Sequence, residues 1–315
     1  MAFDRLVADA DVLVHNARPR IEAALGMTYE RLSNLNERLI VVGITGFGRD
    51  GPNVDRPAVD LVVQGVSGLL TVNGFPDAPV RVATTVIDYQ AAWIAACAVT
   101  TGLVARARTG IGERIDVNLY DAALSLQAST ITDYLASGVL PERTGNEAQL
   151  GAPAGVYETA SGSVVLSAYF PGQWHSLCRL LGLPELEHDD RFVDNDARLR
   201  HRAELNAVLV PRLLAEPATI WLEQFAAAGI TCGPVSDYAD ICTGEQVAAS
   251  RILADIGTPA TGPVGTVELP MTIGGARGRP TRRLPVLDEF REQVLASGFE
   301  ELVAADASAT QPTRR

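Results

Sequence analysis

The most regular hydrophobic pattern in the chain lies between Ile87 and Asp121. Within it an Ala-rich apolar run from Ala91 to Arg106 predicts a helix of about five turns, which residues 109–112 (TGIG) would end. Asp88 precedes the run, so we expect this acid to cap the exposed N–H groups of the helix. Because the run has almost no polar side before its arginines, we also expect the helix to be buried on several sides.

Short apolar strands alternate with helices around this segment. We expect strands at Val12–Asn16, Leu39–Ile44 and Arg114–Asn118, and helices at Ile21–Leu25, Tyr29–Glu37, Ala58–Gly65 and Tyr120–Ser137. This alternation predicts an α/β fold with a mostly parallel sheet that helices cover on both faces. Ligands of such sheets bind at the carboxyl ends of the strands. Asn16 and the glycine-rich loop Thr45–Pro52 are therefore candidates to line a site.

The pattern changes twice along the chain. Proline, glycine and polar residues gather between Gly138 and Pro153, and we place a domain boundary there, so that residues 1–150 form a large domain. A hairpin pattern followed by helices then predicts a smaller α+β domain over residues 151–257. We expect residues 258–315 to be an extended return strap with a helix at Leu287–Ser297 that packs on the large domain.

Charge and cysteine content narrow the classes of ligand. The net charge is -12 and the pI is near 4.8, which argues against nucleic acid as a partner because its phosphates would be repelled. An anionic ligand would have to meet a local positive patch. The four cysteines include no pair at metal-ligand spacing, and the acidic runs form no evident coordination sphere. We therefore expect no metal site.

The amino-terminal sequence and the apolar helix bear on location. Residues 1–19 have neither a basic start nor a long apolar core, which argues against a signal peptide. The apolar helix is interrupted by Thr100, Thr101 and Gly102, so we expect no membrane span and a cytoplasmic protein.

Two interpretations of Asp88 follow from its position. It is either a structural cap, which is the commoner role of an acid at a helix start, or an ionised carboxylate that attacks a substrate or abstracts a proton. The spacing of residues alone does not choose between them.

Several motifs occur in an order that resembles the family III CoA-transferases of the CaiB/BaiF type. They are VLVHNARP, VVGITGFGRDGP, DLVVQGVSGLL, TGIGERIDVNLYDAAL and GAPAGVYETASGSVVLSA, and the resemblance runs from Phe3 to about Phe299. The family includes formyl-CoA and carnitine CoA-transferases and the 2-methylacyl-CoA racemases. The resemblance implies an incomplete Rossmann-like large domain, a smaller α+β domain and an interlocked homodimer. It also implies coenzyme A, as an acyl-CoA, as the substrate together with a carboxylic acid acceptor.

The resemblance assigns roles to individual residues. Asp88 matches the catalytic aspartate, which would form a mixed anhydride with the acyl group and then an aspartyl thioester with CoA. Residues that match the CoA-binding segments are Asn16, Ala17, Arg18, Arg56, Pro57, Ala58, Val59 and Asp60. Arg18, Arg49 and Arg56 are plausible partners for the CoA phosphates.

The sequence departs from the family pattern in three places. The racemases place a histidine just before the position of Asp60, where this chain has Val59, so CoA transfer ranks above racemisation. The segment Gly151–Gly155 does not reproduce the glycine run of formyl-CoA transferases, and oxalate or formate specificity does not follow. The family's first βα units precede the point where this chain starts. We therefore expect a chain shortened at its amino terminus, and an alternative is a non-catalytic or split subunit that pairs with a separate amino-terminal subunit.

Overall fold

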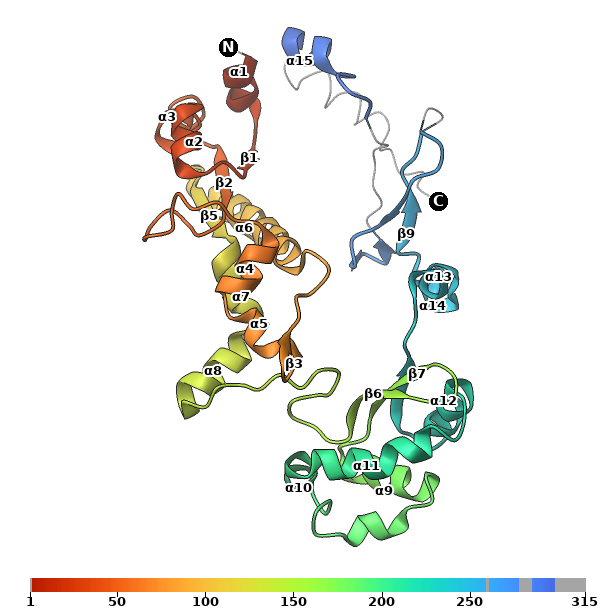
Figure 1. Cartoon of the computed structure of the whole chain (residues 1–315). Helices are drawn as coiled ribbons and strands as arrows, with labels where there is room; N and C mark the ends of the chain where they lie inside the picture. The colour runs from red at the N-terminus through yellow and green to blue at the C-terminus, as the bar shows by residue number, and fades with distance from the viewer. Residues whose placement is uncertain (1, 259–260, 278–284, 298–315) are drawn as a thin grey trace. The chain divides into compact units, whose positions relative to one another are not determined.

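A computed structural model describes residues 2–258, 261–277 and 285–297 (Figure 1). The chain divides into two compact units, which are described one at a time. The first holds residues 2–71 and 81–141 with the described residues from 252 onward, and the second holds residues 72–80 and 142–251. The sequence analysis placed the domain boundaries at 150/151 and 257/258 and expected residues 72–80 in the large domain, whereas these residues belong to the second unit.

A three-stranded parallel sheet forms the centre of the first unit. Its order is β1 (Val12–His15), β2 (Ile40–Thr45) and β5 (Arg114–Asn118), with Val42 opposite Val14 on one side and Ile115 on the other. The parallel sheet predicted from the sequence is confirmed. The apolar run Ile40–Gly43 is buried throughout, which is why β2 takes the central place.

Helices cover both faces of this sheet. Successive residues of β2 point to opposite faces, so they pack against different helices. Val41 packs with Val7 and Leu32, which lie in α1 (Ala2–Asp9) and α3 (Tyr29–Ser33). Ile40 and Val42 pack in a second cluster with residues of α4 (Asp60–Val66), α6 (Val86–Thr109) and α7 (Leu119–Leu126). The remaining helices of these segments are α2 (Pro19–Ala24), α5 (Leu69–Val72) and α8 (Ala128–Ser137).

The long helix α6 differs from its prediction in two respects. It begins at Val86, so Asp88 lies in its first turn rather than before it, and the N-cap residue is Thr85. Its buried residues form one stripe on the side of the sheet, and they are Ile87, Ala91, Ala95, Gly102 and Arg106. Trp93 and Val104 on other faces are exposed, so the expected burial on several sides is wrong for the described structure. Within the described residues, α6 is the helix whose length and apolar composition would suffice to cross a membrane, a property that core helices of globular proteins share.

Antiparallel strands and helices make up the second unit. Its sheet has the order β6 (Ala154–Glu158), β7 (Ser163–Ser167) and β8 (Thr231–Pro234), and the predicted hairpin is formed by β6 and β7. The accompanying elements are β3 (Gly74–Phe75), β4 (Ala78–Pro79), α9 (Pro171–Leu180), the 3-10 helix Pro184–His188, α10 (Asn195–Arg200), α11 (Arg202–Leu213), α12 (Ala218–Ala227), α13 (Tyr238–Thr243) and α14 (Glu245–Ser250).

Arg198 is a buried charge within this second unit. Its guanidinium donates to the carbonyl oxygens of Ala152 at 2.6 Å, Phe192 at 2.9 Å and Tyr169 at 2.9 Å. It also lies over the Trp174 ring, 4.8 Å from the ring centroid. Arg198 therefore ties α10 to the chain on either side of the hairpin.

The last described segments are short. They comprise β9 (Leu253–Asp255), β10 (Gly265–Val267), β11 (Thr272–Ile273), β12 (Ala276–Arg277) and α15 (Arg291–Ser297). Strands β9 with β10 and β11 with β12 form antiparallel pairs, so the expected strap at 258–315 contains β10 and the β11–β12 pair, whereas β9 precedes it. The rest of the strap and the chain end, at 259–260, 278–284 and 298–315, lie outside the described residues.

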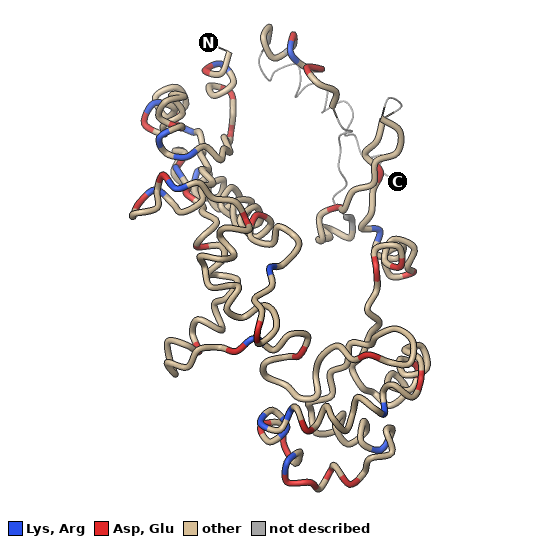
Figure 2. The backbone as a smooth tube through the Cα atoms, viewed as in Figure 1, with Lys and Arg blue, Asp and Glu red and all other residues tan. Residues whose placement is uncertain are grey.

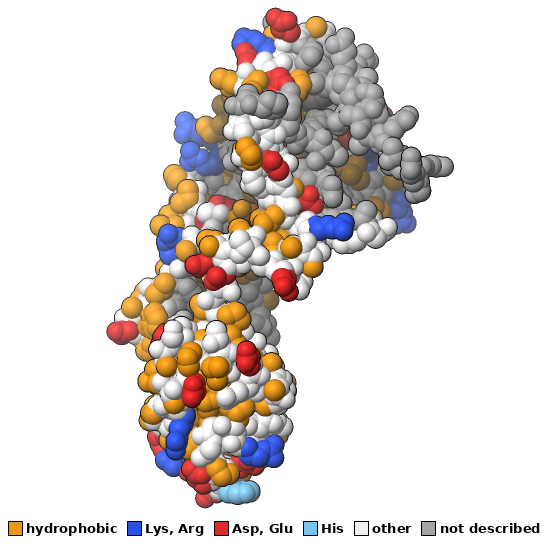
Figure 3. Space-filling model, turned by 90° about the vertical axis from the view of Figure 1, so that its right-hand side faces the viewer, with side chains coloured by type: hydrophobic (Ala, Val, Ile, Leu, Met, Phe, Trp, Pro, Cys, Tyr) orange, Lys and Arg blue, Asp and Glu red, His pale blue; other side chains and the backbone are white. Residues whose placement is uncertain are grey.

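Acidic and basic residues are scattered along the backbone, and both kinds occur in several parts of it (Figure 2). On the face drawn in Figure 3, hydrophobic side chains lie between the charged ones. The excess of acids in the composition is thus not gathered into one segment, and a local positive site remains compatible with the net charge of -12.

Candidate active site

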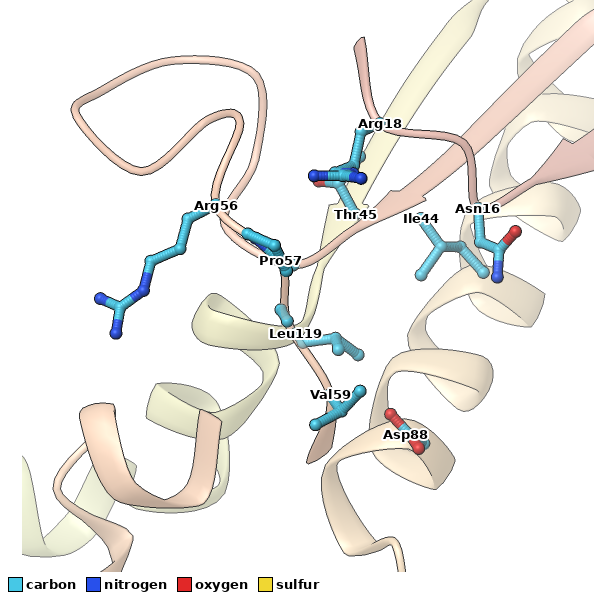
Figure 4. A pocket seen from close by; sticks show the side chains of 11 residues that line it. Asn16, Arg18, Ile44, Thr45, Arg56, Pro57, Val59, Asp88 and Leu119 are labelled. Atoms are coloured by element: carbon cyan, nitrogen blue, oxygen red, sulfur yellow. The ribbon is translucent and has the colours of Figure 1, made fainter. Parts of the chain in front are cut away.

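A pocket of about 390 Å³ lies at the carboxyl ends of β1 and β2, in the first unit (Figure 4). This is the edge of the sheet where the strand pattern predicts a ligand site, and the volume is in the range of small-molecule pockets. Eleven residues from five segments line it: Asn16, Arg18, Ile44, Thr45, Gly46, Arg56, Pro57, Ala58, Val59, Asp88 and Leu119.

The wall of the pocket depends on a close approach of two backbone segments. A Cβ atom on Gly46 would lie 2.3 Å from the Cβ atom of Ala58, so only glycine permits this spacing. Two hydrogen bonds hold the turn after β2. The Gly48 N–H donates to Thr45 Oγ1 at 3.0 Å, and the Tyr120 N–H donates to the Gly46 carbonyl oxygen at 3.1 Å.

Asp88 projects into this pocket from the first turn of α6 (Figure 4). The N-cap position of α6 belongs to Thr85 and Asp88 follows it inside the first turn, so the interpretation of Asp88 as the cap of the helix is wrong. Burial raises the pKa of the Asp88 carboxyl above its usual range, and the nearby charge of Asp60 raises it further. A helix N-terminus by itself favours an ionised carboxylate, but burial and Asp60 shift the pKa of Asp88 in the opposite direction.

Asp60 supplies the cap from another helix. Its Oδ2 accepts the N–H of Ile87 at 2.8 Å and lies 3.4 Å from the backbone nitrogen of Asp88. Its Oδ1 accepts from Gln64 Nε2 at 2.6 Å. Asp60 is buried and is not among the residues that line the pocket, although we predicted it as a CoA-binding residue. Its carboxylate is directed at the start of α6.

The three arginines considered as phosphate partners have different surroundings. Arg18 and Arg56 line the pocket and are exposed. Arg49 does not line it, because its guanidinium binds both carboxylate oxygens of the buried Glu22 at 2.5 Å and lies 3.2 Å from Asp116. Since two carboxylates already occupy Arg49, the structure does not support it as a phosphate ligand.

The other predicted residues divide between the pocket and its surroundings. Asn16, Pro57, Ala58 and Val59 line the pocket. Ala17 does not, and its N–H donates to His15 Nδ1 at 3.3 Å, which shapes the turn after β1.

Two lining residues escaped the sequence analysis. Leu119 directly follows β5, and Ile44 lies near the end of β2. The rule that singled out Asn16 applies equally to the carboxyl end of β5, and would have found Leu119.

No group of three or more His, Cys, Asp or Glu side chains among the described residues is arranged to hold a metal ion. The charged groups at the pocket are thus Asp88, Arg18 and Arg56, set among apolar side chains. Such a site can hold an anionic ligand with an apolar portion and present a carboxylate to it.

Comparison with known proteins gave consistent results. The family model of CoA-transferase family III matches residues 1–290. An acetyl-CoA:oxalate CoA-transferase from Acetobacter aceti is 36% identical over 257 residues, which cover 81% of this chain and 66% of that protein. A succinate–glutarate CoA-transferase from Agrobacterium fabrum is 31% identical, with 97% of this chain and 76% of the relative covered. This chain spans 55% of an acyl-CoA transferase from Fusarium pseudograminearum, to which it is 34% identical.

Solved structures show the same relationship. A CAIB/BAIF family protein from Brucella suis superimposes with a TM-score of 0.83 at 32% identity, covering 94% of this chain and 77% of that one. A mutant of Rv3272 from Mycobacterium tuberculosis, in which an aspartate is replaced by alanine, gives a TM-score of 0.81 at 28% identity, with 92% and 77% covered.

Proposed function

Because this chain belongs to CoA-transferase family III, we propose that it moves CoA from an acyl-CoA thioester to a free carboxylate, with Asp88 as the nucleophile. One observation carries the proposal. The Asp88 carboxylate lines a pocket that also contains two arginines, Arg18 and Arg56, and several apolar side chains. CoA has the matching parts, since its phosphates are anionic and its pantetheine arm ends in the reacting sulfur.

The proposed reaction has four steps on Asp88. A carboxylate oxygen attacks the thioester carbonyl, the carbon–sulfur bond breaks, and a mixed anhydride and CoA thiolate form. The thiolate then attacks the Asp88 carbonyl, which releases the donor acid and leaves an aspartyl thioester. The acceptor carboxylate attacks this thioester, giving a second anhydride and CoA thiolate. The thiolate attacks the acceptor's carbonyl, which yields the new acyl-CoA and restores Asp88, with no net uptake of a proton.

The neighbouring side chains have proposed roles in binding. Arg18 and Arg56 would pair with phosphate oxygens, for which a guanidinium has suitable donors. Val59 and Leu119 would contact the pantetheine arm and keep water from the anhydrides, which would otherwise be hydrolysed. Asn16, also on the pocket wall, would donate its amide N–H to the reacting carbonyl oxygen.

The acceptor is proposed only as a carboxylic acid. Relatives are named for oxalate, glutarate and D-citramalate, and these acids are the first to test. Donor candidates from the same names are acetyl-CoA and succinyl-CoA.

Two alternative functions would give different experimental results. Racemisation of a 2-methylacyl-CoA needs a second proton-transfer group, and no histidine is among the residues of the described structure that line this pocket. It would be detected as deuterium uptake from solvent. A non-catalytic subunit of a CoA-transferase would bind CoA but would not exchange it between acids.

We also propose the interlocked homodimer of the sequence analysis, and a stable monomer in a sizing measurement would contradict it.

The decisive experiment compares Asp88→Asn with Asp133→Asn, a control in which an exposed acid of α8 is neutralised in the same way. Exchange of labelled oxalate or glutarate into acyl-CoA should fall on the order of 10³-fold or more in the first variant and stay unchanged in the control. Hydroxylamine should trap the acylated Asp88 in the unmodified protein, where mass spectrometry locates it. Undiminished exchange by Asp88→Asn would exclude the mechanism.

A further inference from the structure

We propose that Asp60 is a positioning residue: its buried carboxylate anchors the first turn of α6 and thereby fixes the Asp88 side chain in the pocket. The inference rests on the proposed role of Asp88 as nucleophile. It gives Asp60 a task other than contact with CoA.

The first turn of a helix has N–H groups without partners inside the helix. In α6 the N-cap residue Thr85 makes no side-chain hydrogen bond. Asp60 takes over this function from the start of α4, where its Oδ2 accepts the Ile87 N–H at 2.8 Å and approaches the Asp88 nitrogen at 3.4 Å. The backbone that carries Asp88 is thus tied to a different helix, and it cannot turn without breaking a buried, charge-assisted bond.

Gln64 completes this connection from the next turn of α4. It is fully buried, and its Nε2 donates to Asp60 Oδ1 at 2.6 Å and to the Val82 carbonyl oxygen at 3.1 Å. Its Oε1 accepts the Val82 N–H at 2.9 Å. The segment that leads into α6 and the first turn of α6 are therefore both fixed to α4. Asp60 and Gln64, which are hydrogen-bonded to each other, together tie Val82 and the start of α6 to the same helix.

Geometry and charge act together at this point. Asp60 is close enough to raise the pKa of Asp88, in addition to the effect of burial. The other charged side chains that face the pocket are Arg18 and Arg56, and the pKa shift of Asp88 is due to neither. A carboxylate of higher pKa is the stronger nucleophile once it is ionised. Asp60 would thus set both the place and the basicity of Asp88.

The test uses Asp60→Asn, Asp60→Ala and the control Asp121→Asn. Asp121 is likewise an acid in the first turn of a helix, α7, and like Asp60 it does not line the pocket, but its carboxylate accepts from the Asn118 side chain and not from the start of α6. Asp60→Asn keeps an oxygen that can accept the Ile87 N–H and removes the charge, whereas Asp60→Ala removes both. For each variant we would measure the melting temperature, kcat and KM for acyl-CoA against pH, and the titration of Asp88 by carboxyl ¹³C NMR, assigned with Asp88→Asn.

The expected results separate positioning from binding. Asp60→Ala should lower kcat on the order of 10²-fold with little change of KM, and Asp60→Asn should recover much of this loss. In Asp60→Asn the acid limb of the rate profile and the NMR titration of Asp88 should both move to lower pH, while Asp121→Asn moves neither. If Asp60→Asn instead raised KM at constant kcat, Asp60 would be a CoA-binding residue. If it left the Asp88 titration in place, the inference would be overturned.

The two proposals fail in different ways. If the proposed function is wrong, CoA exchange will survive the Asp88→Asn substitution. The NMR titration of Asp88 needs no activity, so it tests the effect of the Asp60 charge on Asp88 in either case.

Discussion

Replacing Gly46 with alanine should displace one wall of the pocket. The added Cβ would lie 2.3 Å from the Ala58 Cβ, whereas two carbon atoms in contact are about 3.5 to 4.0 Å apart. The segments carrying Gly46 and Ala58 would thus have to separate by about 1.2 Å or more. A methyl group attached directly to the backbone has no rotamer that avoids the clash, so the backbone itself must shift.

The size of the effect follows from this displacement. Overfilling a packed site costs about 1 to 3 kcal/mol in the free energy of unfolding. A shift of about 1 Å in a binding wall can lower kcat/KM on the order of 10²-fold. The Gly46 carbonyl accepts the Tyr120 N–H at 3.1 Å, so movement on that side would also strain the start of α7. Movement on the Ala58 side would fall on the proposed CoA-binding segment.

A double-mutant cycle measures the clash directly. Urea unfolding and CoA titration calorimetry would be applied to Gly46→Ala, Ala58→Gly and the pair together. Moving the methyl from one segment to the other restores the space, so the pair should be more stable than the sum of the single changes by about 1 to 3 kcal/mol. The control is Gly172→Ala, since a Cβ there meets no atom within 4 Å. A Gly46→Ala protein with normal stability and CoA affinity, or a pair without coupling, would refute the reasoning.

Three further predictions concern charged groups. Exchange activity should fall as the pH drops through the raised pKa of Asp88, because only the carboxylate attacks. The folded state holds this proton more tightly than the unfolded chain does, so ionisation of Asp88 costs stability as the pH rises. In urea titrations at two pH values, Asp88→Asn should therefore gain stability relative to the unmodified protein at the higher pH. Arg198→Ala would leave three carbonyl oxygens, in two buried bonds and one part-buried bond, without their donor and should cost about 3 kcal/mol or more. Arg200→Ala on the exposed side of α10 should change stability by about 0.5 kcal/mol or less. Equal losses of stability in denaturant would contradict this. Arg18→Ala should weaken CoA binding on the order of tenfold without affecting pantetheine, as measured by calorimetry, while Arg49→Ala should mainly lower the melting temperature because Arg49 pairs with buried Glu22.

The sheet could be predicted because its signal is local. The run Ile40–Ile44 has no polar side chain, which suits a strand buried on both faces, and the strands around it begin and end close to their predicted residues. The position of the pocket followed from the same pattern, since parallel strands present their carboxyl ends at one edge. Asn16 and Thr45 were found in this way.

The partners of the charged residues could not be predicted, because they come from distant parts of the chain. Arg49 looked free for a phosphate, yet it pairs with Glu22, 27 residues earlier. The faces of α6 were misjudged for a related reason. Its Ala-rich run has no polar side that would mark which face packs on the sheet, and the stripe of buried residues that includes Gly102, beside Ile40 and Ile115, reveals that face.

The capping acid and the proposed nucleophile are separate residues, and this separation has a chemical consequence. An acid that caps its own helix uses its carboxylate oxygens on backbone N–H groups, which lowers its pKa and turns it away from a ligand. Asp60 satisfies the Ile87 N–H from α4, so the oxygens of Asp88 need not bond to α6 and lie at the pocket instead. The sequence offered a cap or a nucleophile as rival roles for one aspartate. The fold assigns the cap to Asp60 and thereby leaves Asp88 available for the chemistry.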